Sequence, residues 1–131
     1  KQFGKPIGRQ QALQQNLAIM AEDAIAVRIA AQLGAASGLP PTLAAAAVAK
    51  ATASAASPRI AATAHALHGA IGVSAEFDLQ LLTRRLYAWR LADGSKGYWC
   101  GALGGARMDK ARSSVEFVRA ECFSQASPMP R

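Results

Sequence analysis

The chain has 131 residues, enough for one domain with a modest hydrophobic core. Although 51% of its residues are hydrophobic, no apolar run approaches the roughly 20 residues that a membrane span requires, so we expect no membrane segment. The net charge of +7 favours polyanionic partners, either nucleic acid or small molecules that carry phosphate, such as nucleotides and coenzyme A. A solvated basic surface would give the same charge.

The two cysteines form no CxxC pattern and have no neighbouring histidine. We therefore expect both to be reduced core residues in a cytoplasmic protein that binds no metal. The first residues show neither an initiator methionine nor a signal-peptide pattern, so we expect a fragment, a processed product or the observed part of a longer protein.

Residues 10–34 are predicted to form a first helix, because their apolar residues recur every three or four positions. This stripe consists of Leu13, Leu17, Met20, Ala24, Val27 and Ala31. Pro40 and Pro41 end it, and Thr42 is the expected N-cap of a second, alanine-rich helical region. Within that region Ser57 and Pro58 predict either a kink or a restart, and "HGAIG" at 68–72 ends it.

A third helix is predicted over residues 76–91, with Ser74 as its N-cap. Its apolar stripe consists of Leu79, Leu82, Leu86 and Trp89. An Asp93–Gly94 turn follows, which taken alone is an ordinary helix-ending turn. The next segment has Gly97, Gly101 and Gly105 at every fourth position, a spacing that in a helix would form a flat groove for another helix.

The last amphipathic pattern precedes an expected flexible tail, residues 124–131. It consists of Met108, Ala111, Val115, Val118 and Cys122. Strand patterns are essentially missing from the sequence. The periodicity therefore predicts an all-α protein, an antiparallel helical bundle, and by itself says nothing about chemistry.

Three blocks of the sequence resemble, in order and spacing, motifs of the C-terminal domain of acyl-CoA dehydrogenases. They are "KQFGKPIGRQQALQQNLAIMA" (1–21), "HALHGAIGVSAEFDLQLLTRR" (65–85) and "RLADGSKG" (90–97). The family motifs are "RxQFGKPIxxxQAxQxxLA", "VQIHGGIGFTxExPLxRxxRD" and "IYEGTxxI". The resemblance implies such a domain over residues 1–123, without the family's first helix and with a divergent closing helix at 97–123.

The resemblance also implies a function, because the family members are FAD-dependent oxidoreductases. A carboxylate removes the α-proton of an acyl-CoA thioester, the flavin accepts the β-hydride, and an electron-transfer flavoprotein takes the electrons. The family's base, the glutamate of "EGT", corresponds to Asp93. Gly94 and Ser95 then replace the glycine and threonine beside the flavin.

Further residues match family positions that contact FAD from a neighbouring subunit, which implies a homodimer or homotetramer. They are Gln2, Phe3, His68, Gly69, Ala70 and Gly72. Arg84 is a candidate substrate contact through the phosphates of coenzyme A. Without the other two blocks, "HGAIG" would be interpreted as a plain helix C-cap turn. His65 has no matching role and is expected to be a partly buried helix residue, and Tyr98 and Trp99 to be packing or interface residues.

The sequence departs from the family at several site positions. Asp93 is one methylene shorter than the usual glutamate, about 1.5 Å of reach, although the related nitroalkane oxidases use aspartate at this place. Ala66 replaces a glutamine that contacts FAD, Arg85 replaces the aspartate of "RD", and Ala92 replaces an aromatic residue. Two alternatives therefore stay open: a catalytically silent partner subunit, or a DNA-binding domain like that of the alkylation-response flavoproteins, favoured by the basic charge.

Overall fold

The computed structural model describes Gly4, residues 6–110 and residues 113–122. Helices make up its regular structure, and no strand occurs in these ranges. The elements are the 3-10 helices η1 (Ile7–Arg9) and η2 (Gly69–Val73) and the α-helices α1 (Gln11–Ala36), α2 (Leu43–His68), α3 (Leu79–Leu91), α4 (Lys96–Met108) and α5 (Ser114–Cys122). The predicted fold class, an all-α antiparallel bundle, is confirmed.

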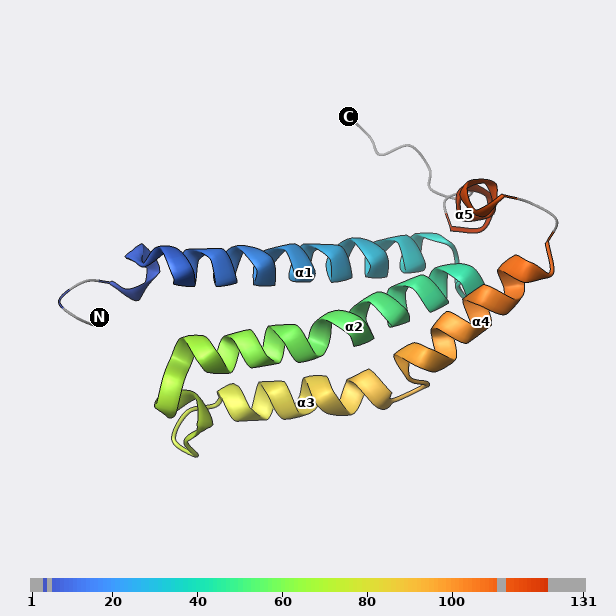
Figure 1. Cartoon of the computed structure of the whole chain (residues 1–131). Helices are drawn as coiled ribbons and strands as arrows, with labels where there is room; N and C mark the ends of the chain where they lie inside the picture. Colours follow the sequence, from blue (N-terminus) through green and yellow to red (C-terminus); the bar gives the residue numbers. More distant parts are fainter. Residues whose placement is uncertain (1–3, 5, 111–112, 123–131) are drawn as a thin grey trace.

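Helix α2 is the centre of the molecule. It packs against α1 on one side and against α3 and α4 on the other, and α1, α2 and α3 run antiparallel, side by side (Figure 1). Its buried residues are small: Ala44, Ala45, Ala47, Ser54, Ala56 and Ala61. A methyl group on Gly34 of α1 would lie only 3.3 Å from the Cβ of Ala49. The small residues thus let the two long helices approach closely.

The predicted apolar stripe of α1 is correct only in part. Ala30 and Gly34 are the buried residues of α1, whereas Ala24 and Ala31 are exposed and Leu17 is 39% exposed. Helix α1 makes most of its contacts with a single helix, α2. The buried face of α1 is therefore narrow. It consists of the residues small enough to let α1 and α2 approach each other most closely, not of the largest apolar residues.

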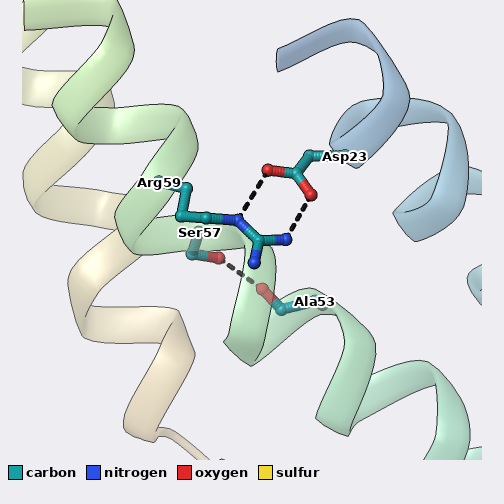
Figure 2. Close-up of polar contacts among 4 residues, drawn as sticks. All are labelled: Asp23, Ala53, Ser57 and Arg59. Atoms are coloured by element: carbon teal, nitrogen blue, oxygen red, sulfur yellow. Dashed lines mark hydrogen bonds and ion pairs between the residues drawn. The ribbon is translucent and has the colours of Figure 1, made fainter. Parts of the chain in front are cut away.

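Helix α2 begins where the sequence predicts, and it continues through its proline. The Thr42 hydroxyl accepts a hydrogen bond from the Ala45 amide at 3.2 Å, which makes Thr42 the N-cap. Pro58 lies inside the helix and does not restart it. The Ser57 hydroxyl donates to the Ala53 carbonyl at 2.7 Å, one turn earlier (Figure 2).

An ion pair joins α1 to α2 just beyond this proline. Arg59 donates through Nε to Asp23 Oδ2 at 3.0 Å and through Nη2 to Oδ1, a bidentate arrangement (Figure 2). These hydrogen bonds from Arg59 hold the pKa of Asp23 below its usual value, and the carboxylate in turn raises the pKa of Arg59. The Arg59 side chain is 64% exposed, so solvent screens the pair.

Helix α3 differs from its prediction in start and orientation. It begins at Leu79 with Asp78 as its N-cap, whereas the Ser74 hydroxyl donates to the Ile71 carbonyl and closes η2. Its buried residue is Thr83, while the predicted stripe residues Leu82 and Trp89 are 59% and 61% exposed. Leu79 and Leu86 of that stripe are half-buried, so the predicted stripe is correct only in part, and polar residues of α3 share its contact with α2.

The chain after the Asp93 turn also departs from the expected pattern. Two helices, α4 (Lys96–Met108) and α5 (Ser114–Cys122), take the place of the single predicted closing helix. Methyl groups on Gly101, Gly104 and Gly105 would meet no atom within 4 Å, so among the described residues no helix occupies the predicted glycine groove. Ala111 and the tail lie outside the described residues.

Helix α5 buries Phe117, which is 3% exposed, rather than the predicted valines. Val115 and Val118 are 60% and 42% exposed, and Met108 of the same predicted stripe is 81% exposed. The Ser113 amide donates to the Glu116 carboxylate and the Glu116 amide to the Ser113 hydroxyl, a capping box that begins α5. Helix α5 thus starts anew and does not continue the helical periodicity of α4. The break between α4 and α5 is why a stripe continued across it fails.

Candidate active-site turn and glycine block

Asp93 lies in the turn between α3 and α4. Its φ is 54°, and no other non-glycine residue of the described ranges has a positive φ. Gly94 follows with φ 100°, and Ser95 is the N-cap of α4, its hydroxyl accepting from the Tyr98 amide at 3.3 Å. The Asp93 side chain is exposed. Its carboxylate makes no hydrogen bond or ion pair with a described residue, so it is free to act on a ligand.

Polar contacts from α2 hold the end of α3, directly before this turn. Lys50 Nζ donates to the Trp89 carbonyl at 2.6 Å, and the Ser54 hydroxyl donates to the Arg90 carbonyl at 3.1 Å. In return, Arg90 Nε donates to the Ser54 carbonyl at 3.1 Å. The last carbonyls of a helix have no partner within it, and α2 supplies donors for two of them here.

Pro58 explains why the Ser54 carbonyl is available to Arg90. In an uninterrupted helix this carbonyl accepts from the amide four residues later, which is position 58. Proline has no amide hydrogen, so the carbonyl needs another donor. Ser54 is 1% exposed, which excludes bulk water as that donor. Sequence reasoning missed this link, although a proline one helical turn after a buried serine is a usable signal.

The glycine block lies at the other end of α3, where α2 passes into η2. Gly69 has φ 60° and ψ −144°, a conformation that essentially only glycine adopts. A methyl group there would meet nothing within 4 Å, whereas one on Gly72 would lie 2.8 Å from the Cβ of His68. Gly69 therefore presents open backbone, and Gly72 allows η2 to fold tightly against α2.

Two histidines flank this block and behave differently. His68 is exposed; its Nδ1 contacts the Ala64 carbonyl at 2.7 Å, and its ring lies 5.0 Å from that of Phe77. His65 is partly buried, as predicted, with Nε2 at 2.9 Å from the Thr83 hydroxyl. Because that hydroxyl donates to a carbonyl of its own helix, its oxygen accepts from His65. The His65 Nδ1 atom is buried without a partner among the described residues.

The predicted site residues thus form two separate groups. One consists of Asp93, Gly94 and Ser95, and the other of His68, Gly69, Ala70 and Gly72. Helix α3 separates them, and its 13 residues span about 20 Å. Arg84 is exposed on α3 between the two groups, while Gln2 and Phe3 lie outside the described residues.

A family model for the acyl-CoA dehydrogenase C-terminal domain matches residues 1–106 of the chain. The chain belongs to this family. The match includes both groups of candidate residues, and the acyl-CoA dehydrogenase domain has the all-α architecture seen here. No curated protein gives a significant match, and neither does any solved structure.

The remaining features of this acyl-CoA dehydrogenase domain lie away from the two groups. A cavity of about 330 Å³ at the far end of α2 is lined mainly by α2, α4 and α5, with Thr42, Ala106 and Phe117 among its residues. Cys122 is half-buried, with its thiol pKa raised by burial, whereas Cys100 is exposed, which corrects the expectation that both are core residues.

Within the described ranges, no three or more metal-ligating side chains gather in one cluster, and no helix has the length and hydrophobicity of a membrane span.

Proposed function

We propose that this domain serves a FAD-dependent dehydrogenase in which Asp93 removes the α-proton of an acyl-CoA thioester. One observation carries the proposal. A family match spans the turn, and Asp93, which we assign to the family's base position, has an exposed, unpaired carboxylate on a left-handed turn. Unusual backbone of this kind concentrates at functional sites.

The glycine block fits a flavin nucleotide in one specific respect. Gly69 leaves open space where a side chain would stand, so a phosphate or ribityl group could approach the backbone closely. His68 and Ala70 flank this surface, and Gln2 and Phe3 would contact the same FAD. Gly72 is buried and acts indirectly, by holding η2 in place. Bound FAD would supply the hydride acceptor for the β-hydrogen.

The separation of the two groups favours an oligomer. Since α3 keeps the glycine block about 20 Å from Asp93, we infer that the block contacts FAD bound beside another chain's Asp93, in a homodimer or homotetramer. Asp93 is exposed in this chain, so the bound thioester and a neighbouring subunit would supply the apolar surroundings that a base requires. Gly94 and Ser95 would lie beside the flavin, and Arg84 would contact the phosphates of coenzyme A.

We further infer the electron acceptor and the cellular location. An electron-transfer flavoprotein is the natural acceptor for the electrons. A cytoplasmic location agrees with the two free thiols, because a reducing compartment keeps such thiols unpaired.

The test is anaerobic reduction of the full-length protein after reconstitution with FAD. We expect flavin bleaching with at least one of butyryl-, octanoyl- and palmitoyl-CoA. Asp93→Asn should slow it by about 10²–10⁴-fold, the usual contribution of a general base. Asp109→Asn, which removes another exposed acid from the end of α4, should leave the rate unchanged. Bleaching of Asp93→Asn at the wild-type rate would refute the assignment.

DNA binding is a second candidate, favoured by the arginines of α3. Arg84 and Arg85 are both exposed, and the Arg85 guanidinium lies 5.6 Å from the Trp89 ring centroid. If the domain binds duplex DNA through these residues, its affinity should fall steeply with salt concentration. Arg84→Gln and Arg85→Gln should then flatten the dependence on salt. A protein that neither bleaches nor binds DNA would be a catalytically silent subunit.

A further inference from the structure

The turn that carries Asp93 is tied to the next helix by a tryptophan. The Trp99 indole Nε1–H donates to the Asp93 carbonyl at 2.8 Å, six residues back along the chain. Aspartate takes a positive φ, here 54°, more readily than most residues, so this hydrogen bond is what distinguishes the turn from an unrestrained Asp–Gly turn. Among the described residues, this is the hydrogen bond that joins α4 to the Asp93 backbone.

Two aromatic rings close over the same turn. A methyl group on Gly94 would lie 2.7 Å from Tyr98 Cδ1 and 2.9 Å from Trp99 Nε1, so the rings leave no room for a side chain there. Tyr98 and Trp99 contact each other edge to face, with centroids 5.2 Å apart. The Ser95 cap fixes the first turn of α4, so this helix presents both rings in a defined position.

The carboxylate itself has no comparable support. It is exposed and makes no hydrogen bond or ion pair with a described residue, so the backbone of the turn and the side chain's own two torsions determine where it points. Aspartate also has one side-chain torsion fewer than glutamate and can compensate less for a shift of its backbone. Its position therefore depends strongly on whatever holds the turn.

We propose that Trp99 is a positioning residue for Asp93: its indole N–H holds the left-handed turn and so directs the carboxylate at the substrate. The proposal rests on the proposed function of Asp93 as the base. It assigns a role to a residue that the sequence alone suggested only for packing or an interface.

The test compares Trp99→Phe with Trp89→Phe in the full-length protein. Trp99→Phe keeps an aromatic ring and removes the indole donor. Trp89→Phe removes an indole that is 61% exposed, has no hydrogen-bond partner among the described residues and lies just before the same turn. We expect Trp99→Phe to slow flavin reduction by octanoyl-CoA at least about tenfold, because displacement of a reacting group by ~1 Å costs on the order of a hundredfold.

A loss of positioning should leave substrate binding intact. The dissociation constant for octanoyl-CoA should therefore stay within about twofold in both variants, and Trp89→Phe should also keep its rate. If Trp99→Phe reduces at the wild-type rate while Asp93→Asn does not reduce, the positioning role is refuted and the base assignment stands. If Asp93→Asn reduces normally, the proposed function fails first, and this role with it.

A second measurement requires neither activity nor a stable variant. In ¹H–¹⁵N spectra of the wild-type protein, the Trp99 indole hydrogen should exchange with solvent at least about tenfold more slowly than that of Trp89, because the Trp99 indole donates a hydrogen bond and the Trp89 indole donates none to a described residue. The two indole signals are assigned from their loss in each phenylalanine variant or by selective labelling. Equal exchange rates would overturn the proposal even if Trp99→Phe did not fold.

Discussion

Replacing Arg90 by methionine should destabilise the fold, and the size of the loss should depend on Pro58. The change removes the hydrogen bond from the Arg90 guanidinium to the Ser54 carbonyl, a bond with a charged donor worth about 1.5–3 kcal/mol. It also leaves that carbonyl unpaired on a residue that is 1% exposed. We therefore expect a loss of about 2–3 kcal/mol in the free energy of unfolding.

The role of Pro58 makes this prediction specific. Pro58→Ala restores an amide hydrogen at the position from which a regular helix bonds the Ser54 carbonyl. In that background the carbonyl keeps a partner when Arg90 is removed. The cost of Arg90→Met should then fall by about 1 kcal/mol or more, which a double-mutant cycle measures as a coupling energy.

The assay is urea unfolding, followed by circular dichroism, of the wild type, Arg90→Met, Pro58→Ala and the double variant. Equal m-values would show that the four transitions are comparable. Arg84→Met serves as the control, because Arg84 is exposed on the same helix; it should change stability by no more than about 0.5 kcal/mol. An equal cost of Arg90→Met with proline or alanine at position 58 would refute the reasoning.

Two further predictions concern α1 and the glycine block. Asp23→Asn should lower the melting temperature at pH 7. Because Arg59 lowers the pKa of Asp23 in the folded state, the ion pair stabilises the fold fully above the ordinary pKa of 3.8. This stabilisation is lost as the pH falls through the lower pKa of the folded state. If Asp23→Asn lowered the melting temperature as much at pH 3 as at pH 7, this explanation would be wrong. Gly72→Ala should destabilise the fold by about 1–3 kcal/mol, because the new methyl group would lie 2.8 Å from the His68 Cβ. The control is Gly101→Ala, whose methyl group would meet no atom within 4 Å; it should be neutral or stabilise the fold by up to about 1 kcal/mol.

Much of the local structure could be predicted from the sequence. The hydroxyl of Thr42, the two prolines before it and the glycine after His68 mark helix ends through chemistry that belongs to single residues or neighbours. These boundaries agree with the structure to within a few residues. The same holds for the turn at Asp93 and Gly94, because an Asp–Gly pair readily takes positive φ.

The buried faces could be predicted less well. An apolar stripe predicts burial only if hydrophobicity decides how a helix is rotated. In α3 the polar groups decide instead: Thr83 is buried against His65, and Arg90 bonds Ser54, while Leu82 and Trp89 stay exposed. The buried side chains of α2 are small, so they favour no particular apolar residue of α3 over another. Hydrogen bonds therefore have more influence on how the two helices pack.

By itself, the sequence determined the helical fold, the ends of the first two helices, the family and the turn proposed to carry the base, because each depends on residues close together in the chain or on an ordered set of motifs. The tertiary structure decided which faces are buried, that Arg90 replaces the donor lost at Pro58, and that Trp99 holds the Asp93 turn. These relations join residues through space, through hydrogen bonds that the periodicity of apolar residues does not reveal.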